Sequence, residues 1–142
     1  MGRSLITFIG LVLFGCAQQS ENLMAEAAQV HNLSVKIGEH VEQKIRTIEQ
    51  YALKETSSTK KELMDSVKSL DQDLLEWKNQ LVEVPGNDHD GHHDHAHHEA
   101  PADLTPQMIL DIQREINRQI IQLNVRSQHL LDQFNDTTEL SL

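Results

Sequence analysis

The sequence has little cysteine and few aromatic residues. It contains one cysteine, one tryptophan, one tyrosine and three phenylalanines among 142 residues. A lone cysteine excludes an intramolecular disulfide, a zinc site built from several thiolates, and a c-type haem site, which needs a Cys-x-x-Cys-His motif. Large rings usually fill a rounded core. Their scarcity therefore favours a thin bundle whose helices meet along aliphatic seams.

Basic residues are also scarce. The chain has 12 Lys and Arg against 22 Asp and Glu, which gives a formal net charge of −10. Such a chain repels nucleic acid and anionic lipid, so we expect neither as a ligand. The length allows one domain at most. The sequence shows no nucleophile–base pair and no glycine-rich phosphate loop, so we predict that the protein is not an enzyme.

Long apolar runs are absent. The longest spans Leu5–Phe14, ten residues interrupted by Thr7 and Gly10. A transmembrane helix needs roughly 20 apolar residues, so this run is too short to cross a bilayer. With Arg3 before it, the run is typical of the apolar region of a signal peptide.

The end of this run resembles the lipobox of bacterial lipoproteins. Residues 13–16 read Leu-Phe-Gly-Cys. The resemblance implies that residues 1–15 are removed, that Cys16 carries a covalent lipid, and that residues 16–22 tether the protein to a membrane. Because Ala17 is not the Asp associated with inner-membrane retention, we expect the outer membrane, facing the periplasm. The alternative is an ordinary signal peptide followed by a free thiol.

Three segments carry apolar residues at steps of three and four. They predict helices at about 23–54, 59–84 and 105–136, within a bundle spanning 23–138 and followed by a short tail at 139–142. The second helix has an unbroken 4-3-4-3-4 repeat, typical of a coiled-coil seam. No segment alternates like a strand. We therefore predict an all-α fold, an antiparallel three-helix up-down-up bundle that resembles a coiled coil.

The predicted inward positions share this spacing. In the first helix they are Ala27, Val30, Ile37, Val41, Ile45, Ile48 and Ala52; in the second Leu63, Val67, Leu70, Leu74, Trp77 and Leu81; in the third Ile109, Ile112, Ile116, Ile120, Leu123, Leu130, Leu131 and Phe134.

Local signals mark the helix starts. Thr59 and Glu62 form a capping box, and Thr105 followed by Pro106 is typical of an N-cap and a first helical residue. One continuous helix through residues 57–58 is the competing interpretation of the first two segments.

The segment between the second and third helices is rich in histidine. Asn87–Glu99 contains six of the nine histidines, and the breakers Pro85, Gly86 and Pro101 flank it. We predict a disordered loop over 85–104. Neutral imidazole suits Zn²⁺, Cu²⁺ and Ni²⁺. The candidate metal ligands in the loop are His89, His92, His93, His95, His97, His98, Asp88, Asp90, Asp94 and Glu99.

The chemistry expected of this loop is loose binding. Interchangeable ligands on a flexible chain hold no single geometry, so the loop suits capture, buffering or hand-over of a metal rather than catalysis. Three alternatives remain: a passive linker, a pH-responsive loop, and a calcium loop. Asp88, Asp90 and Gly91 imitate part of an EF-hand, but both ends of that pattern fail.

The other histidines lie in the predicted helices. His31 and Glu83 are both 26 positions from the turn between the first two helices, so we expect them at one level and add His31 as a candidate ligand. We expect His40 and His129 on the surface and Trp77 in the core. The second helix should end about 10 Å short of the start of the first, so the loop should hang near the membrane.

The first two predicted helices carry a family resemblance. Val30-His31 followed by Lys36 and Gly38, together with Leu-Glu-Trp at 75–77, resembles small helical lipoproteins of Bacteroidota that often carry the label viral A-type inclusion protein. The resemblance implies location and architecture but no activity. Two functions follow: binding of transition metals through the loop, or a coiled-coil interaction lipoprotein for an envelope partner or a second copy, with a passive loop.

Overall fold

The computed structural model describes most of the chain. Side chains are described between residues 18 and 133, within the ranges that follow. The described residues are 9–56, 59–87, 100–101 and 103–139.

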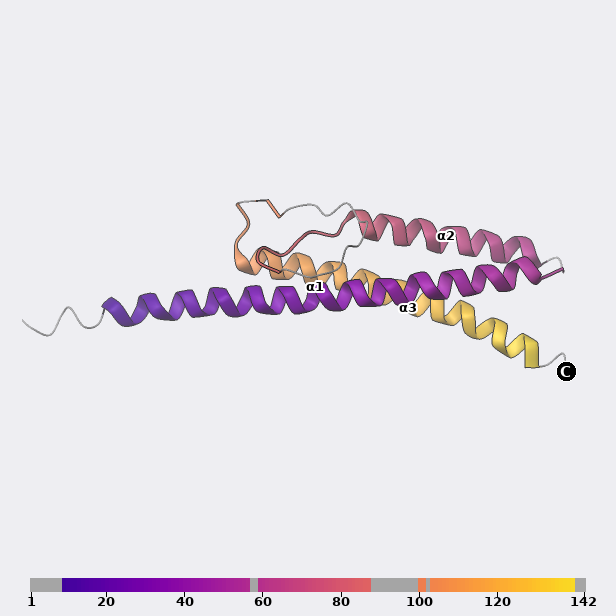
Figure 1. Cartoon of the computed structure of the whole chain (residues 1–142), viewed down its shortest axis with the longest axis horizontal. Coiled ribbons are helices and arrows are strands. Elements are labelled where there is room, and N and C mark those ends of the chain that lie inside the picture. The colour runs from indigo at the N-terminus through magenta and orange to yellow at the C-terminus, as the bar shows by residue number, and fades with distance from the viewer. Residues whose placement is uncertain (1–8, 57–58, 88–99, 102, 140–142) are drawn as a thin grey trace, which may run out of the picture.

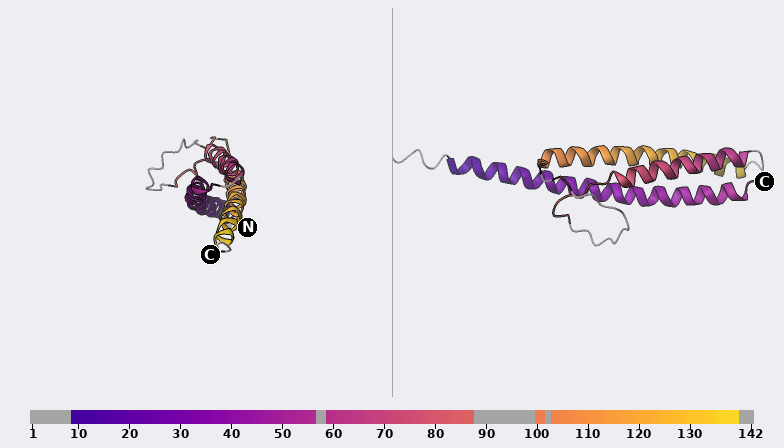
Figure 2. Two further views of the ribbon diagram at one scale, coloured as in Figure 1. Left: turned by 90° about the vertical axis from the view of Figure 1, so that its right-hand side faces the viewer. Right: turned by 90° about the horizontal axis from the view of Figure 1, so that it is seen from above.

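Three helices make up the structure: α1 at Ile9–Lys54, α2 at Thr59–Asn79 and α3 at Pro106–Glu139. They form an elongated molecule in which α2 lies back along the C-terminal half of α1 and α3 lies beside α1 (Figure 1, Figure 2). The described part of the chain contains no strand. The prediction of an all-helical protein with packed helices is therefore confirmed.

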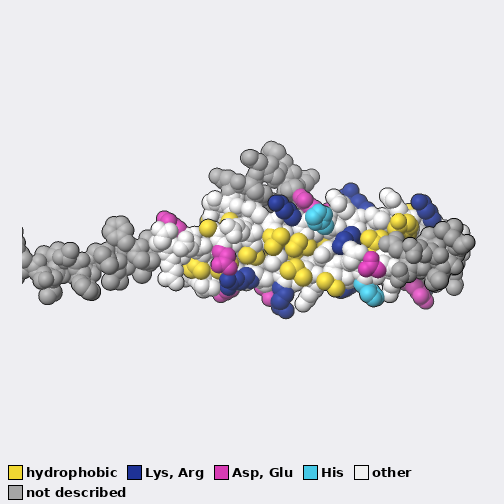
Figure 3. Space-filling model, turned by 90° about the horizontal axis from the view of Figure 1, so that it is seen from below, with side chains coloured by type: hydrophobic (Ala, Val, Ile, Leu, Met, Phe, Trp, Pro, Cys, Tyr) yellow, Lys and Arg dark blue, Asp and Glu magenta, His cyan; other side chains and the backbone are white. Residues whose placement is uncertain are grey.

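Polar contacts give the register of α1 and α3. His31 meets Gln113, and further along Lys44 meets Asn124. Because the paired residue numbers rise together, the two helices run in the same direction. Seen from below, away from α2, hydrophobic side chains gather along the middle of the face where α1 and α3 meet (Figure 3).

The first helix begins earlier than predicted. It starts at Ile9 rather than near residue 23, and it continues through residues 16–22, which we expected to be a non-helical tether. These residues include Ala, Gln and Glu, which favour a helix, and no proline. Among the described residues, no helix is both long enough and apolar enough to cross a membrane.

The second helix ends earlier than predicted. Its last residue is Asn79, whereas the periodicity predicted about residue 84. Pro85 disfavours a helical conformation only at Val84, the residue before it, so the proline alone does not account for an end at Asn79. The carbonyl of Val82, outside the helix, instead accepts a hydrogen bond from Nε2 of Gln113 at 2.7 Å. A side chain of α3 thus stabilises the non-helical path of residues 80–84.

The end of α1 and the starts of α2 and α3 lie at or within one residue of their predicted positions. α1 ends at Lys54 and α2 begins at Thr59, so the first two helices are separate. The backbone N–H of Met108 donates to Oγ1 of Thr105 at 3.3 Å, which is an N-cap directly before Pro106. The third helix runs to Glu139, a few residues beyond the expected end.

Apolar side chains form two clusters. The main cluster joins all three helices, and a small cluster joins the first half of α1 to the start of α3. The buried members of the main cluster are Val41, Ile45, Ile48, Val67, Leu70, Leu74, Trp77, Leu81, Ile116, Ile120 and Leu123. Those of the small cluster are Ala27, Val84, Ile109 and Leu110.

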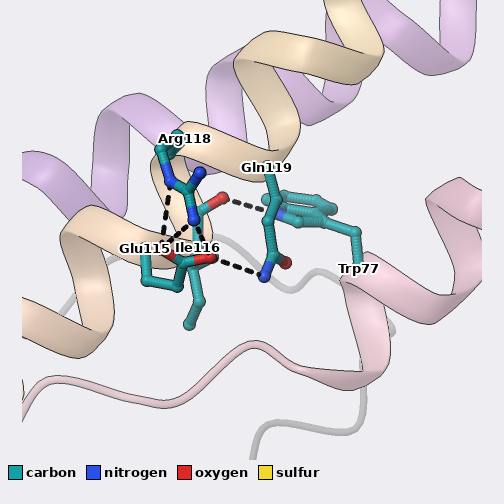
Figure 4. A network of polar contacts seen from close by, with 5 residues as sticks. All are labelled: Trp77, Glu115, Ile116, Arg118 and Gln119. Atoms are coloured by element: carbon teal, nitrogen blue, oxygen red, sulfur yellow. Dashed lines mark hydrogen bonds and ion pairs between the residues drawn. The ribbon is translucent and has the colours of Figure 1, made fainter.

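Trp77 links the three helices in the main cluster. Its Nε1 donates to the carbonyl of Ile116 at 3.0 Å (Figure 4). Its ring lies against Gly38 of α1. A Cβ added at Gly38 would lie 2.6 Å and 2.7 Å from two ring atoms. This contact explains a glycine inside a helix, where it is less favourable than alanine by about 1 kcal/mol. The prediction that Trp77 is a core residue is confirmed.

Candidate functional site

Most of the predicted metal ligands lie outside the described residues. Asp88–Glu99, which holds all ten loop candidates, is not among them, and neither are the side chains of Cys16 and Phe134. What the structure does describe is how the chain approaches this segment and leaves it. The base of the histidine-rich segment is therefore the part of the site whose geometry can be read.

Two asparagines attach the start of the segment to α1. Nδ2 of Asn87 donates to Oδ1 of Asn32 at 3.0 Å, and Nδ2 of Asn32 lies 3.4 Å from Oδ1 of Asn87. The N–H of Asn87 also donates to the carbonyl of Val84 at 3.0 Å. This turn needs a positive φ, 79°, at Gly86, which glycine adopts without strain.

The chain returns near the same part of α1. The N–H of Leu104 donates to the carbonyl of Pro101 at 3.2 Å, and Leu104 packs on the small cluster that contains Ala27. The start of the segment is thus bonded to α1 at Asn32, and the chain after it packs on the cluster to which Ala27 of α1 contributes. The helix rises about 24 Å from Cys16 to Asn32. Because residues 16–22 are helical and not an extended tether, the helix fixes this separation.

His31 lies beside this base and is fully buried. Its Nδ1 is 3.2 Å from Oε1 of Gln113, whose Nε2 donates to Val82. The second bond fixes the amide of Gln113 with its oxygen toward the imidazole, so Nδ1 of His31 must carry a proton. In the neutral ring Nε2 is then the nitrogen with the lone pair. The chain of contacts from His31 to Val82 agrees with the predicted level of His31 near the end of the second segment.

A second buried polar contact follows one turn later. Oγ of Ser34 donates to the carbonyl of Val30 at 2.8 Å and lies 3.2 Å from Oδ1 of Asn117. Ser34 is fully buried. We call His31, Ser34, Gln113 and Asn117 the polar layer. It lies between α1 and α3, next to the attachment of the histidine-rich segment.

The sequence analysis missed this layer. It predicted that Val30 and Ile37 point inward. In the structure both are only partly buried, Val30 against the small cluster and Ile37 against the main cluster. The fully buried positions are His31 and Ser34. The signal was present: the step pattern of four and three from Ala27 leads to these two residues, but the search counted apolar residues only.

The other histidines lie where they were predicted. His40 and His129 are exposed, on α1 and α3 respectively. Within the described ranges, no group of three or more His, Cys, Asp or Glu side chains could hold a metal ion.

Carboxylates near α2 have shifted pKa values. The hydrogen bond from Nζ of Lys78, at 2.7 Å, lowers the pKa of Glu42 below its ordinary value. Burial raises the pKa of Asp71, and the charges of Glu49 and Glu42 raise it further. Negative charge is thus crowded where α1 meets α2.

Surface ion pairs also occur on α3. The guanidinium of Arg118 donates to Glu115 and thereby lowers the pKa of that carboxyl (Figure 4). Both groups are exposed, so this pair contributes little to stability.

Comparisons with protein-family models, curated proteins and solved structures found no match to this chain. The resemblance to Bacteroidota lipoproteins stays a prediction, and function has to be argued from the residues themselves.

Proposed function

We propose that this protein binds transition-metal ions, Zn²⁺, Cu²⁺ or Ni²⁺, through the histidine-rich segment Asp88–Glu99, for metal capture, buffering or hand-over. One observation carries the proposal: six imidazoles and four carboxylates fall within twelve consecutive residues. Imidazole nitrogens are preferred ligands of these ions, and so dense a group offers ligands for one or two of them.

The scaffold supports such a role by holding the segment at its base. The paired side chains of Asn32 and Asn87 fix its start, and Leu104 packs just after its end. A segment held at both ends keeps its ligands close together, which raises their effective concentration.

His31 is an additional ligand in this proposal. In metal sites the ligating histidine usually donates its second ring nitrogen to a carbonyl or carboxylate oxygen, and Nδ1 of His31 donates to Gln113 in this way. The ring is completely buried, so a metal could reach it only after the base opens. In the described structure His31 acts as a packing residue of the polar layer.

The proposed location and architecture complete this function. The protein would be an up-down-up, coiled-coil-like bundle, a member of the lipoproteins it resembles, anchored through a lipid on Cys16 to the outer membrane and facing the periplasm. The lipobox-like sequence at 13–16 supports the anchor. Mass spectrometry of the protein from cells tests it, because lipidation predicts an acylated N-terminus at Cys16.

The decisive experiment is metal titration of the full chain. A variant with the six loop histidines changed to asparagine should lose binding of Zn²⁺, Cu²⁺ and Ni²⁺ at micromolar concentrations. The matched control, His40→Asn with His129→Asn, removes two exposed histidines elsewhere and should bind like the parent. Equal binding by the six-histidine variant and the parent would refute the proposal. A synthetic 85–104 peptide that binds as tightly as the chain would show that the scaffold adds nothing.

A second function, as an interaction protein with a passive loop, is favoured by a groove of about 450 Å³ between α2 and α3. Val125 lines it and is exposed. Leu74, a natural choice for a seam mutation, is buried inside the chain, so Leu74→Asp would destabilise the fold and could not test an interaction surface. Val125→Asp tests the groove directly. If it abolishes function in cells while loss of the loop histidines changes nothing, the interaction role is correct.

A further inference from the structure

A polar hollow lies between α1 and α3, further along α1 than the polar layer. Its volume is about 450 Å³. Pockets that hold small organic ligands have volumes of about 300–1,000 Å³. The side chains that line the hollow are all polar: His40, Gln43, Lys44, Thr47 and Asn124. An apolar ligand would find no partner among them, so a ligand of this hollow has to be held by charge and hydrogen bonds.

Lys44 is the charged group of the hollow. It is partly buried, and its Nζ crosses to α3 and donates to Oδ1 of Asn124 at 2.9 Å. Three other cations that cross between helices end on carboxylates: Lys78 on Glu42, Arg114 on Glu26 and Arg126 on Asp73. Within the described ranges Lys44 contacts no carboxylate, although the chain has 22 Asp and Glu against 12 Lys and Arg. No contact in the described structure therefore neutralises this lysine.

The carboxylates of α1 that are nearest in sequence lie on another side of the helix. Glu42 pairs with a lysine of α2, so it points toward α2. Residues three and seven positions apart share one side of such a helix, which places Glu39 and Glu49 on the same side as Glu42. Across the hollow, α3 has no Asp or Glu from residue 116 to residue 131. The ammonium of Lys44 therefore sets the sign of the charge at the hollow.

Hydrogen-bond donors accompany this charge. Because Oδ1 of Asn124 accepts from Lys44, Nδ2 of the same amide is left as a donor. The ammonium has three N–H groups, of which one is used on Asn124, and Gln43 and His40 add further N–H groups. Thr47 does not contribute, since its hydroxyl donates to the carbonyl of Gln43 at 2.9 Å. Several N–H donors around one positive charge suit an oxyanion.

The type of cation indicates which oxyanion fits. A planar carboxylate is matched best by the two parallel N–H groups of an arginine, and no arginine lines this hollow. A lysine acts as a point charge and is a common partner of phosphate. The oxygens of phosphate are arranged tetrahedrally and can accept from donors on several sides.

We propose that this hollow binds a phosphate group, as free phosphate or as the phosphate monoester of a small molecule. Lys44 is its charged partner, and Asn124 both positions the ammonium and donates from α3. The volume leaves room for the organic part of a small monoester. This site is separate from the histidine-rich segment and requires no metal.

Titration of the full chain in detergent with inorganic phosphate, followed by amide NMR spectroscopy, tests the site. EDTA is present throughout, so that metal on the histidine-rich segment cannot carry phosphate, and potassium chloride keeps the ionic strength constant. We expect saturable shifts at the amides around residues 40–47 and 121–125, with a dissociation constant of about 1 mM or lower. Glycerol 3-phosphate should shift the same amides. Tighter binding of glycerol 3-phosphate than of phosphate would identify a monoester as the ligand, and equal binding would identify the phosphate group alone.

Substitutions at Lys44 test its role. Lys44→Gln should weaken phosphate binding at least about tenfold, because the charged hydrogen-bond donor is lost. Lys44→Arg keeps the charge and should retain most of the affinity. Asn124→Ala should cause a smaller loss than Lys44→Gln, since the ammonium remains. Lys68→Gln is the matched control: it changes an exposed lysine of α2, makes the same change in net charge, and should bind phosphate like the parent.

The amide spectrum of each variant also shows whether it is folded, so misfolding is not mistaken for loss of the site. Shifts that do not saturate, or that spread over the whole surface, would overturn the proposal. Equal affinities of the parent and Lys44→Gln, or an equal loss in Lys68→Gln, would also overturn it. The six-histidine variant should bind phosphate normally, so failure of this site is distinct from failure of metal binding.

Discussion

The main cluster, which joins all three helices, and the polar layer, which lies between α1 and α3, are built in opposite ways. The main cluster is apolar throughout and its packing is closed by Trp77. The polar layer buries His31 and Gln113 just as completely and joins them by directed hydrogen bonds. Apolar contacts are non-directional and supply most of the stabilisation. Buried polar contacts supply little net energy, but they tolerate few alternatives and so fix register.

This difference assigns the two regions separate tasks. The main cluster holds α1, α2 and α3 together, whereas the polar layer sets how α1, α3 and the chain after α2 align. The attachment of the histidine-rich segment at Asn32 and Asn87 adjoins the polar layer and not the main cluster. The following changes test this division of tasks.

The largest effect should come from Trp77→Ala. Removing a buried indole and its hydrogen bond to Ile116 should lower the free energy of unfolding by about 3–5 kcal/mol, measured by urea denaturation. Val125→Ala, on an exposed site, serves as the control and should change it by less than about 0.5 kcal/mol. A small effect at Trp77 would mean that the main cluster is not the source of stability.

Gln113→Leu should lower the free energy of unfolding by about 2–3 kcal/mol, because it takes a partner from both His31 and the Val82 carbonyl. The double variant with His31→Leu should lose less stability than the sum of the two single variants. Gln113→Leu alone leaves the buried imidazole without this hydrogen bond, and that penalty disappears when His31 is replaced as well. Additive effects in this double-mutant cycle would show that the two side chains are not coupled.

Gly38→Ala separates helix propensity from packing. Alanine favours the helix by about 1 kcal/mol, but its Cβ would collide with the Trp77 ring, so we expect a net loss of about 1–2 kcal/mol. In a Trp77→Leu background the collision disappears and the same change should become stabilising. The sign of the stability change caused by Gly38→Ala in the Trp77→Leu background, measured from denaturation midpoints, tests the contact between Gly38 and the Trp77 ring.

Asn32→Ala should have a smaller effect, about 1 kcal/mol, concentrated at the base of the histidine-rich segment. Hydrogen exchange should speed up at residues 82–87 while the amides of the main cluster keep their protection. Uniformly faster exchange would show that the attachment belongs to the same cooperative unit as the main cluster.

The smallest effect is electrostatic and depends on pH. The folded pKa of Glu42 is lowered, so its contribution is present above its ordinary value of 4.5 and is lost as pH falls through the lowered folded pKa. Glu42→Gln should therefore lower stability by less than about 1 kcal/mol at pH 7, and this loss should become smaller as the pH falls below 4.5.

Asp71 gives a matched control of opposite sign. Its folded pKa is raised, so ionisation is unfavourable in the folded protein above that pKa. Asp71→Asn should slightly raise stability at pH 7, and this gain should vanish at low pH. If the stability of both variants changed in the same direction with pH, the opposite pKa shifts of Glu42 and Asp71 would be contradicted.

Much of the fold could be predicted because its signals are local. The caps at Thr59 and Thr105 and the breakers around Asn87–Glu99 act within a few residues, and they marked helix starts and a break correctly. The candidate site was less predictable. Its base depends on an amide of α1 meeting one from a turn 55 residues later, which no local pattern encodes.

The sequence by itself determined three helices, because spacings of three and four place apolar side chains along one stripe whatever lies opposite. It also determined the composition of the histidine-rich segment and hence the class of ligand it can attract. Only the tertiary structure decided that α2 stops at Asn79, that Gly38 makes room for an indole, and that His31 and Gln113 belong inside. Each of these depends on an atom supplied by another helix. A buried hydrogen bond or a close contact contributes free energy only when the helices have packed and brought the two atoms together.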